Sequence, residues 1–539
     1  MIKPAIILLL FAGSQAFAEP LKAFAPRRGS SILWSNGQAS LQSKDLDPRL
    51  GKEGWVALRL GAQSPLLGLQ SSRFFARIPD SNTTDYVFLP VDDLKLLDTL
   101  APIAHEETGS CGALEFMPRG YSLQSSIDFA APKFSSWAQF SEIPPILSDI
   151  DAASMQNTVA TLAALTSRYH NHPVGQTAPQ TLAQSWRSLR GTNSAILIDE
   201  FPHQNTAQNS VIAHLPGVDQ ANDTVILGAH LDSIAIRGGG SVQGAAPGAD
   251  DNASGLAILQ EIMRIVESRG MRFHRSVEWQ AYAAEEVGLI GSREIAKHYR
   301  EQSKTIAGML QFDMAAYSSS ADQEGLLYFL EDYTSRDLRR SAMDWLLRYV
   351  GPIVRTGKLP SGSASDHKSW WEQGYSTLFS FENPLAYNPH IHSPADTNQF
   401  FDQGARIKNM AALGLLFLIH EAGWTQLDAA YASQSTQALP VELANDLYLA
   451  IQKADDTSFY LAVSASLAID TIEFCPITDP KDLTCAQERE TLNQAQTRDD
   501  RKIFYQRSTF PLSSQGRWRI LGYDAQGQLK AWRQVELGS

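Results

Sequence analysis

The pattern of apolar residues between 150 and 425 constrains the fold more than any other feature of the chain. Helical periodicity alternates there with short apolar runs, and one helix is marked by Leu256, Leu259, Ile262, Met263 and Val266. The alternation predicts strands at 224–229, 277–284, 306–312 and 376–381 and a closing helix at 404–422. Strands separated by helices are typical of an α/β fold with a mostly parallel central sheet and helices on both faces. We predict this fold for residues 150–427.

The segments on either side, residues 19–145 and 440–539, have a different texture. Both contain short alternating apolar runs between turn residues, which predicts two flanking β-rich domains. The N-terminal one shows no sustained helical pattern. It is either a pro-region, acting as a folding aid or a removable inhibitor, or a permanent structural domain. Near the C-terminus, the Gln-Gly turn within RWRILGYDAQGQLKAWRQVEL predicts a hairpin.

The first 18 residues have the features of a secretory signal peptide. Lys3 precedes an apolar stretch from Ala5 to Gly13, and Ala16, Phe17 and Ala18 form a small-x-small cleavage site. A membrane anchor needs about 20 continuous apolar residues, and the stretch from Ala5 to Gly13 is about half as long. We therefore expect cleavage after Ala18 and no membrane attachment afterwards. The predicted location is the periplasm or the exterior of the cell.

Charge and cysteine content narrow the possible partners and sites. The formal net charge is −13 and no Lys/Arg-rich run stands out, so nucleic acid is not an expected partner. The 3 cysteines include no C-x-x-C pair, so a bound metal has to use histidine and carboxylate ligands. Cys475 and Cys485 either form a disulfide or stay unpaired, and the sequence leaves both possibilities open. Cys111 is expected to be unpaired in either case.

Acids and histidines gather where the predicted strands end. They are His230 and Asp232 after the first strand, Glu285 and Glu286 after the second, Asp313 after the third, and His390 and His392 in the loop after the fourth. The carboxyl ends of parallel strands meet at one edge of a sheet, so we expect these side chains to lie together. Asp250 and Asp251, just before a predicted helix, add two more acids. Taken singly, each pattern has an ordinary explanation in helix capping or solvation.

Together these residues predict a metal site. Clustered acids raise one another's pKa values by repulsion, and a divalent metal removes that cost. Nitrogen and oxygen ligands without thiolate suit catalytic zinc, and two imidazoles with three carboxylates are enough for two ions. Asp232 is placed to accept the second N–H of His230. Of Glu285 and Glu286, one would bind metal while the other carries protons, and spacing alone does not say which.

Six motifs follow one another in the α/β region: GAHLDS (228–233), PGADDNASG (247–255), AYAAEEVGLIGS (281–292), LQFDM (310–314), SDH (365–367) and YNPHIH (387–392). In order and spacing they resemble the secreted bacterial leucyl aminopeptidases of the co-catalytic di-zinc exopeptidase family. The resemblance covers about half of the chain, from 150 to 425. It implies an aminopeptidase with two Zn²⁺ ions that acts on peptides with a free N-terminus. We expect the protein to be a monomer.

The resemblance also implies a role for each residue of the motifs. His230 and Asp313 would bind one zinc, Glu286 and His392 the other, and Asp251 would bridge them, with Glu285 as general base, Asp232 as partner of His230 and His390 as a non-ligand. Two departures stand out. The Cys-x-x-x-Cys bridge of the secretory relatives is replaced by residues 359–365 without cysteine, and Asn252 follows the bridging acid where the relatives have Asp.

Substrate specificity is predicted from the same resemblance. It places the first side chain of the substrate in a pocket lined by Met314, Leu330, Phe379, Phe381, Leu385 and Ile391, with Tyr387 and Ser365 near the cleft. Such a lining favours Leu, Phe or Met, because a charge buried there would lose its hydration. Glu331 leaves a preference for Lys or Arg open, should it turn inward.

Two other functions compete with the aminopeptidase. A non-catalytic binding module of the same fold should lack a metal ligand or the base, and none is missing here. A serine hydrolase should carry a G-x-S-x-G motif, and this sequence has none.

Overall fold

The computed structural model describes, with side chains, residues 51–60, 64, 85–106, 113–121, 123, 140–191, 194–318, 324–351, 353–359, 363–399, 404–428, 471–473 and 520–522, together with the backbone of further strand and helix residues. The chain divides into two compact units, Met1–Ala430 and Tyr431–Ser539. The expected signal peptide at 1–18 and Cys485 lie outside the described residues. Signal cleavage and the Cys475–Cys485 pairing therefore stay predictions, as do the domain boundaries.

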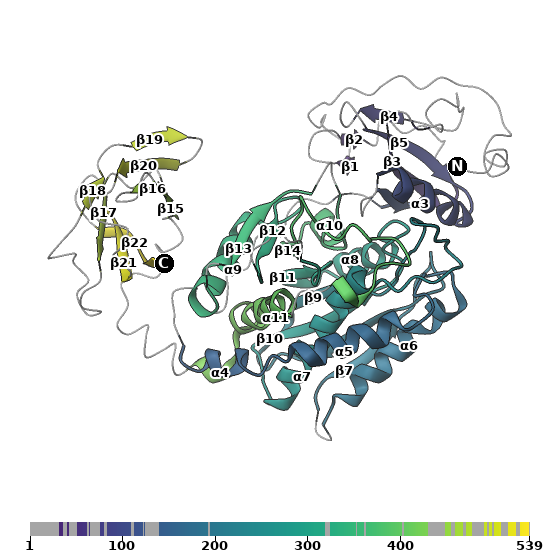
Figure 1. The fold of residues 1–539 in the computed structure, drawn as a ribbon, viewed down its shortest axis with the longest axis horizontal. Helices are drawn as coiled ribbons and strands as arrows, with labels where there is room; N and C mark the ends of the chain where they lie inside the picture. The colour runs from purple at the N-terminus through teal and green to yellow at the C-terminus, as the bar shows by residue number, and fades with distance from the viewer. Residues whose placement is uncertain are drawn as a thin grey trace. The chain divides into compact units, whose positions relative to one another are not determined.

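An eight-stranded mixed sheet forms the centre of the first unit (Figure 1). Its strands are, in spatial order, β13 (Val354–Gly357), β12 (Leu327–Leu330), β14 (Thr377–Phe381), β11 (Thr305–Phe312), β9 (Gln220–His230), β10 (Arg275–Tyr282), β8 (Ser210–Leu215) and β7 (Leu197–Phe201). The central strands β14, β11, β9 and β10 are parallel, and antiparallel pairs occur only toward the edges. The four predicted strands coincide with these four, and the predicted α/β fold class is confirmed.

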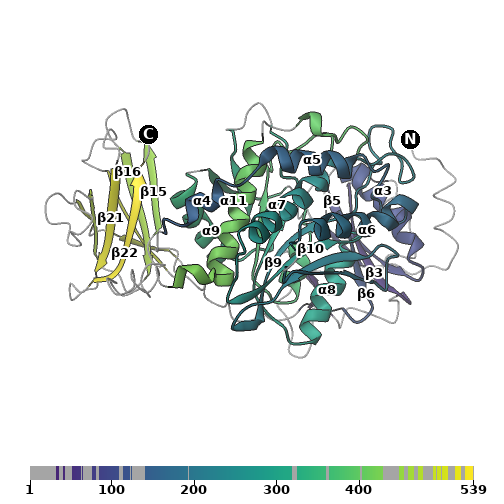
Figure 2. The same ribbon diagram turned by 90° about the horizontal axis from the view of Figure 1, so that it is seen from below.

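Helices cover both faces of this sheet (Figure 2). On one face α5 (Ala152–Ala163), α7 (Gly255–Ser268), α9 (Arg336–Tyr349) and α11 (Ala405–Phe417) contact one another, and on the other α8 (Ile290–Glu301) contacts α10 (His367–Glu372). Two further helices are α4 (Ile143–Leu147) and α6 (Pro173–Ser188). At the start of α7, a Cβ on Gly255 would lie 2.6 Å from the carbonyl oxygen of Phe312. Glycine is therefore needed for α7 to begin against β11.

The register of the parallel strands sets the position of the acids and histidines. His230 ends β9 and pairs with Tyr282, the last residue of β10. Glu285 and Glu286 follow β10 after two residues, and Asp313 directly follows β11, which is hydrogen-bonded to β9 on the other side. One edge of the sheet thus receives side chains from three adjacent strands, as the sequence predicts.

Residues 54–118 form a four-stranded antiparallel sheet with one helix. The strands are, in spatial order, β4 (Ala76–Pro79), β5 (Thr84–Val91), β3 (Gly54–Gly61) and β6 (Leu114–Pro118), and the helix is α3 (Lys95–Thr108); β1 (Ile32–Ser35) pairs with β2 (Ser40–Gln42). The expectation that this region lacks a sustained helix is wrong. Asp93 accepts the N–H of Lys95 at 3.0 Å, and buried Leu97, Leu100 and Ala104 form an apolar stripe. Pro102 inside the helix removes one backbone hydrogen bond and obscured this pattern.

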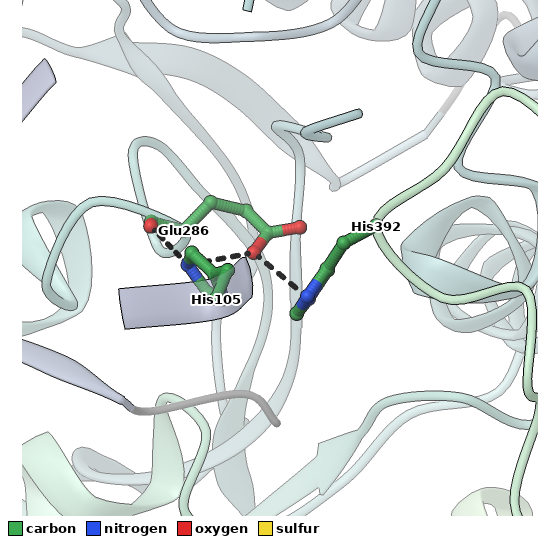
Figure 3. A group of neighbouring side chains, drawn as sticks. All are labelled: His105, Glu286 and His392. Carbon is green, nitrogen blue, oxygen red and sulfur yellow. Dashed lines mark hydrogen bonds and ion pairs between the residues drawn. The ribbon is translucent and has the colours of Figure 1, made fainter. Parts of the chain in front are cut away.

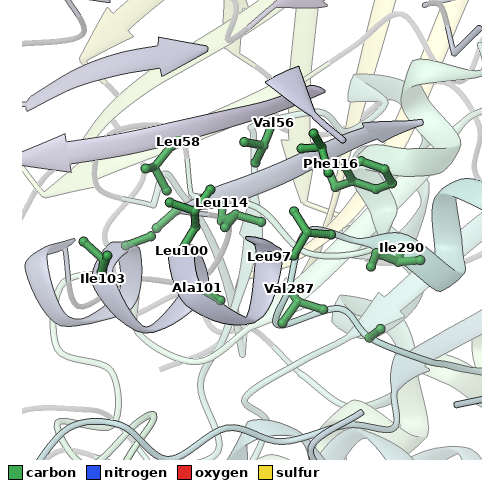
Figure 4. Close-up of a cluster of buried hydrophobic side chains, with 14 of the residues drawn as sticks. Val56, Leu58, Leu97, Leu100, Ala101, Ile103, Leu114, Phe116, Val287 and Ile290 are labelled. Carbon is green, nitrogen blue, oxygen red and sulfur yellow. The ribbon is translucent and has the colours of Figure 1, made fainter. Parts of the chain in front are cut away.

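This N-terminal domain shares a hydrophobic core with the α/β domain (Figure 4). Leu97, Leu100 and Phe116 belong to the same buried cluster as Val287 and Ile290, which follow the Glu285–Glu286 pair. The loop that carries two of the predicted site residues is therefore packed against the N-terminal domain.

A buried ion network joins the same two domains. Glu115 on β6 accepts hydrogen bonds from Lys368 Nζ at 2.7 Å and from Arg293 Nη2 at 2.9 Å. Arg293 also contacts Glu372, at 3.1 Å, and these side chains are at most 1% exposed. Two cations thus face two carboxylates out of contact with water, and one of these carboxylates comes from the N-terminal domain.

The second unit contains two four-stranded antiparallel sheets. One has the order β15 (Tyr448–Lys453), β16 (Phe459–Ser466), β20 (Arg501–Arg507) and β19 (Ala495–Arg498), and the other β18 (Glu490–Leu492), β17 (Thr471–Pro476), β21 (Gly516–Tyr523) and β22 (Leu529–Leu537). The antiparallel pairing of β21 with β22 confirms the predicted hairpin. None of the helices in the described parts of the chain has the length and apolarity to cross a bilayer.

Replacing Glu115 with Gln should lower the free energy of unfolding by about 3–5 kcal/mol, because two buried cations lose their shared counter-charge. Lys297→Ala, which removes an exposed pair with Glu301, should change it by less than about 0.5 kcal/mol. Urea unfolding followed by tryptophan fluorescence measures both. Equal effects of the two substitutions would contradict the buried network.

Candidate metal centre

Two groups of buried ligand atoms lie at the carboxyl edge of the sheet. His230 Nε2 is 3.0 Å from Asp251 Oδ1 and 3.4 Å from Asp313 Oδ1. His392 Nε2 is 3.1 Å from Asp251 Oδ2 and 3.3 Å from Glu286 Oε2. Asp251 therefore turns one oxygen toward each histidine and joins the two groups. The five residues predicted to bind metal all lie in this arrangement.

The spacing of these atoms fits a pair of tetrahedral metal ions. Two ligands that each lie about 2.0–2.2 Å from a zinc ion, at the tetrahedral angle, are roughly 3.3–3.6 Å apart. The observed separations of 3.0 to 3.4 Å are close to this spacing. Among the described residues, both carboxylate oxygens of Asp251 and of Glu286, and Oδ1 of Asp313, are buried without a hydrogen-bond partner. Burying such oxygen atoms costs free energy of folding unless a cation interacts with them.

Unusual backbone conformations direct the candidate ligands toward the site. Ala284, Met314 and His392 have positive φ values of 53°, 50° and 56°. Non-glycine residues in this region cost on the order of 1–3 kcal/mol each and are retained where the surroundings enforce them. Here they reverse the chain directly before Glu285, directly after Asp313 and at a ligand itself.

The loop that carries Asp251 is held by two residues that the sequence analysis did not select. Asp396 accepts the N–H groups of Asp250 at 3.2 Å and Asp251 at 3.1 Å. Arg168, fully buried, donates to the carbonyl oxygen of Gly248 at 2.8 Å. Asp396 stands just beyond the YNPHIH motif, but Arg168 lies 80 residues from Gly248, and only the fold brings them together.

Asn252, one of the departures from the family pattern, also supports this loop. Its Nδ2 donates to the carbonyl oxygen of Phe312 at 2.9 Å, and its Oδ1 accepts the N–H of Gly255 at 3.0 Å. Both ends of the amide are used. The side chain therefore ties the Asp251 loop to β11 without adding a charge beside the ligands.

Asp232 orders the pair of glutamates. Its Oδ1 accepts the N–H of Glu285 at 2.9 Å and its Oδ2 the N–H of Glu286 at 3.2 Å. His230 Nδ1 lies 3.2 Å from the backbone carbonyl of Asp232 and 3.6 Å from its Oδ1. Glu286 belongs to a ligand group, whereas Glu285 does not. The division between ligand and proton carrier, which spacing alone left open, thus has a structural basis.

Burial and repulsion shift the pKa values of these acids. Burial first, and then the nearby Asp251 carboxylate, raise the pKa of Glu286 to about 7. Burial raises the pKa of Glu285 well above its usual value, as the charges of Glu286 and Asp366 also do. A carboxyl group with a raised pKa is suited to accept and return a proton near neutral pH.

For His392, nearby charges outweigh the effect of burial on the pKa. Burial lowers the pKa of His392, but Glu286 and Asp251 outweigh it and raise the pKa to about 10. Burial also disfavours ionised Asp251, yet contacts with His230 and His392 hold its pKa below the usual range. Without metal, protons on the imidazoles balance the carboxylates. Metal binding has to displace these protons.

An apolar pocket opens beside Asp313. Met314, Phe379, Phe381 and Ile391 are at most 3% exposed and form one cluster with Leu330 and Leu359, against which Tyr387 packs. Ser363 and Ala364 line the same pocket where the relatives' disulfide is missing. The predicted substrate residues are brought together with one exception. Leu385 is 87% exposed and lies outside the pocket, because the loop after β14 turns it to the surface.

Ser365, predicted near the cleft, contacts a ligand. Its Oγ donates to Asp313 Oδ2 at 2.6 Å and accepts from Gln311 Nε2 at 3.1 Å. The hydrogen bond occupies one oxygen of Asp313, so the other faces His230. His390, by contrast, belongs to neither ligand group.

His105, which lies on α3 of the N-terminal domain, was not predicted as a site residue from the sequence. Figure 3 shows its ring beside Glu286 and His392. His105 Nε2 is 2.8 Å from the carbonyl oxygen of Glu286 and 3.7 Å from Glu286 Oε2. No motif surrounds His105, so its sequence context offered no signal.

Comparison with known proteins agrees with this geometry. The model of "Peptidase family M28" matches residues 210–416. Leucine aminopeptidase 1 of Colletotrichum graminicola is 30% identical over 301 residues, covering 53% of this chain and 73% of the relative. A probable aminopeptidase of Saccharomyces cerevisiae is 31% identical over 258 residues, covering 47% of this chain and 68% of the relative. The LapA aminopeptidase structure from Legionella pneumophila shares the fold, with a TM-score of 0.55 at 22% identity, covering 69% of this chain and 99% of that one.

The fold and the site together define a metallo-aminopeptidase, an enzyme of the hydrolase class. The chain belongs to peptidase family M28. The five predicted ligands fall within the matched residues 210–416, whereas His105, which completes the group of Glu286 and His392, lies before them.

Replacing Asp251 with Ala should reduce the metal content of the chain from two ions to one or none, because both groups lose a shared ligand. Inductively coupled plasma mass spectrometry of zinc-loaded, dialysed protein measures the content. Glu301→Ala, which removes an exposed acid, serves as control and should leave the content unchanged. Unaltered metal content in Asp251→Ala would argue against a bridging role.

Proposed function

We propose that this protein is a zinc-dependent aminopeptidase that binds two Zn²⁺ ions and removes hydrophobic residues from the N-terminus of peptides. The observation that carries the proposal is the arrangement of Asp251, whose two oxygens face His230 and His392 at 3.0 and 3.1 Å. A bridging carboxylate between two N/O ligand groups is the arrangement of two-metal hydrolases. The aminopeptidase relatives support the choice of peptide substrates.

The residues around the ligands divide the chemistry between them. Bound zinc would lower the pKa of a water molecule toward neutrality and polarise the carbonyl group of the substrate. Glu285 takes a proton from the attacking water and returns it to the departing amine, a transfer suited to a carboxyl group with a raised pKa. Asp232 keeps Glu285 and Glu286 in place through their N–H groups.

The apolar pocket accounts for the proposed preference. Met314, Phe379 and Phe381 surround it with carbon atoms, so a Leu or Phe side chain is favoured over a charged one. Glu331, the residue that left a Lys or Arg preference open, is 39% exposed at its side chain and lies 3.7 Å from Lys358 Nζ. A glutamate paired at the surface is not placed to receive a cationic substrate.

The remaining parts of the proposal concern the setting of the enzyme. The signal-like start of the chain supports export, with action in the periplasm or outside the cell. Peptides with a free N-terminus are the proposed partners, and a monomer is the proposed state. The complete set of ligands and base argues against a binding module, in which such residues need not be retained together.

Glu285→Gln should lower kcat on a leucyl anilide about 10²–10⁴-fold, because the isosteric amide cannot carry a proton. Zinc content should stay at the wild-type value, since Glu285 is not among the ligand atoms. Wild-type protein prepared identically, then stripped with a chelator and reloaded with zinc, provides the reference. Undiminished turnover in Glu285→Gln would remove Glu285 from the mechanism, and turnover insensitive to the chelator would remove the metals.

Leucyl and phenylalanyl anilides should be cleaved with kcat/KM at least tenfold higher than lysyl and arginyl anilides. The charged side chain of a lysyl or arginyl substrate would lose its hydration in the apolar pocket, and this costs binding free energy. Glu331→Gln should leave the ratio unchanged, whereas Phe379→Ser should reduce it. A ratio in favour of lysyl or arginyl substrates that disappears in Glu331→Gln would overturn the proposed preference.

A further inference from the structure

The N-terminal domain places a histidine inside the metal centre of the α/β domain. His105 lies in the last turn of α3, and it is 2% exposed. Its ring meets the ring of His392 edge-on, with the centroids 4.3 Å apart. His105, Glu286 and His392 offer three ligand atoms that lie within 4.8 Å of one another. Figure 3 shows the three side chains converging from separate segments of the chain.

The distances in this group are those of metal ligands. Nε2 of His105 is 3.7 Å from Glu286 Oε2, and Nε2 of His392 is 3.3 Å from the same oxygen. These separations resemble the roughly 3.3–3.6 Å expected between two ligands of one tetrahedral zinc. In one tautomer His105 Nε2 donates its proton to the carbonyl of Glu286, 2.8 Å away. Metal binding by Nε2 requires the other tautomer, with the proton on Nδ1, and a rotation of the ring that turns Nε2 from the carbonyl oxygen toward the metal.

We propose that His105 is a further ligand of the metal pair, supplied by the N-terminal domain to the ion held by Glu286 and His392, and that this contact closes the site to substrate. The proposal rests on the proposed function, because it assumes the two metals. It assigns the N-terminal domain a role in latency, so that the chain is at least tenfold more active once this domain has been displaced.

The domain interface holds His105 firmly in the site. The shared cluster includes Ala283 and Ala284, which precede the glutamate pair, and Val287, which follows it. Asp98 near the start of α3 accepts hydrogen bonds from His170 Nε2 at 2.9 Å and from Asn171 Nδ2 at 3.0 Å. Together with the buried network at Glu115, these contacts fix α3 on the loop that carries the site. A motion of α3 alone would break its contacts with the shared cluster and with His170.

The structure has little room for a substrate at this site. Glu285, Glu286 and His392 are each at most 3% exposed. The apolar pocket beside Asp313 encloses only about 10 Å³, enough for a single water at most. An aminopeptidase has to bring the first residue of a peptide into contact with both metals and pocket. With α3 in place, His105 takes the position at the second metal that such a residue would need.

The first experiment tests ligation on the intact chain loaded with cobalt(II) in place of zinc. Visible absorption reports the number and type of ligands at cobalt. His105→Ala and His105→Gln should both change the spectrum, since neither side chain supplies an imidazole, although Gln retains a donor for the carbonyl of Glu286. Leu97→Ala, which weakens the same interface away from the metals, should leave the spectrum as in the wild type.

The outcomes of this experiment separate the two tautomers. A spectrum that is unchanged in both His105 variants would show that His105 only donates a hydrogen bond, and the proposal would be wrong. His105→Gln keeps the test decisive if His105→Ala does not fold, with circular dichroism as the check of folding.

The second experiment tests closure. A cleavage sequence for a specific protease is inserted within 124–139, the segment that joins the two domains, and the intact, folded, zinc-loaded chain is cut and freed of the N-terminal fragment. Hydrolysis of a leucyl anilide should rise at least tenfold after the fragment is removed, and adding the fragment back should reverse the rise. Equal activity before and after removal would overturn closure by the N-terminal domain.

These readouts keep the proposal separate from the proposed function. If no form of the chain cleaves an aminoacyl anilide while the cobalt spectrum depends on His105, the proposed function fails and the ligation stands. If the intact chain cleaves the anilide fully and its cobalt spectrum is independent of His105, the proposed function stands and this inference fails.

Discussion

The structure is organised around the burial of carboxylates at one edge of the central sheet. Asp251, Glu286 and Asp313 are almost fully removed from water, and several of their oxygens lack hydrogen-bond donors among the described residues. Isolated charges of one sign are not stable in such a position. Two imidazoles, the buried Arg168 guanidinium and, in the proposed enzyme, two zinc ions supply the balancing charge. The backbone distortion at Ala284, Met314 and His392 is a further cost of bringing these groups together.

The N-terminal domain is tied to this arrangement. Its apolar core encloses the residues on both sides of Glu285 and Glu286, and Glu115 balances two buried cations of the α/β domain. Removing the domain would expose apolar surface next to the candidate ligands and take the Glu115 carboxylate away from Lys368 and Arg293. The same interface that orders the glutamate loop also delivers His105. Stability of the loop and closure of the site are therefore properties of one set of contacts.

The departures from the family pattern are accommodated locally. Asn252 uses both ends of its amide to connect the Asp251 loop to β11, a role that needs no charge. The segment without the relatives' disulfide still contributes Leu359, Ser363 and Ala364 to the wall of the apolar pocket. Neither change disturbs a ligand atom. The features that differ are those that shape the walls of the site, while the groups that carry charge remain in place.

The sequence by itself determined the α/β class, the four central strands and the gathering of acids and histidines at their carboxyl ends, because strand direction and period follow from local patterns. It also gave the C-terminal hairpin from its turn. The helix α3 was missed because Pro102 interrupts its pattern, and Leu385 was placed in a pocket that it does not reach. Only the tertiary structure brought Arg168, Asp396 and His105 to the site. Their contacts join segments up to 181 residues apart, and such proximity depends on how whole domains pack, which no local pattern encodes.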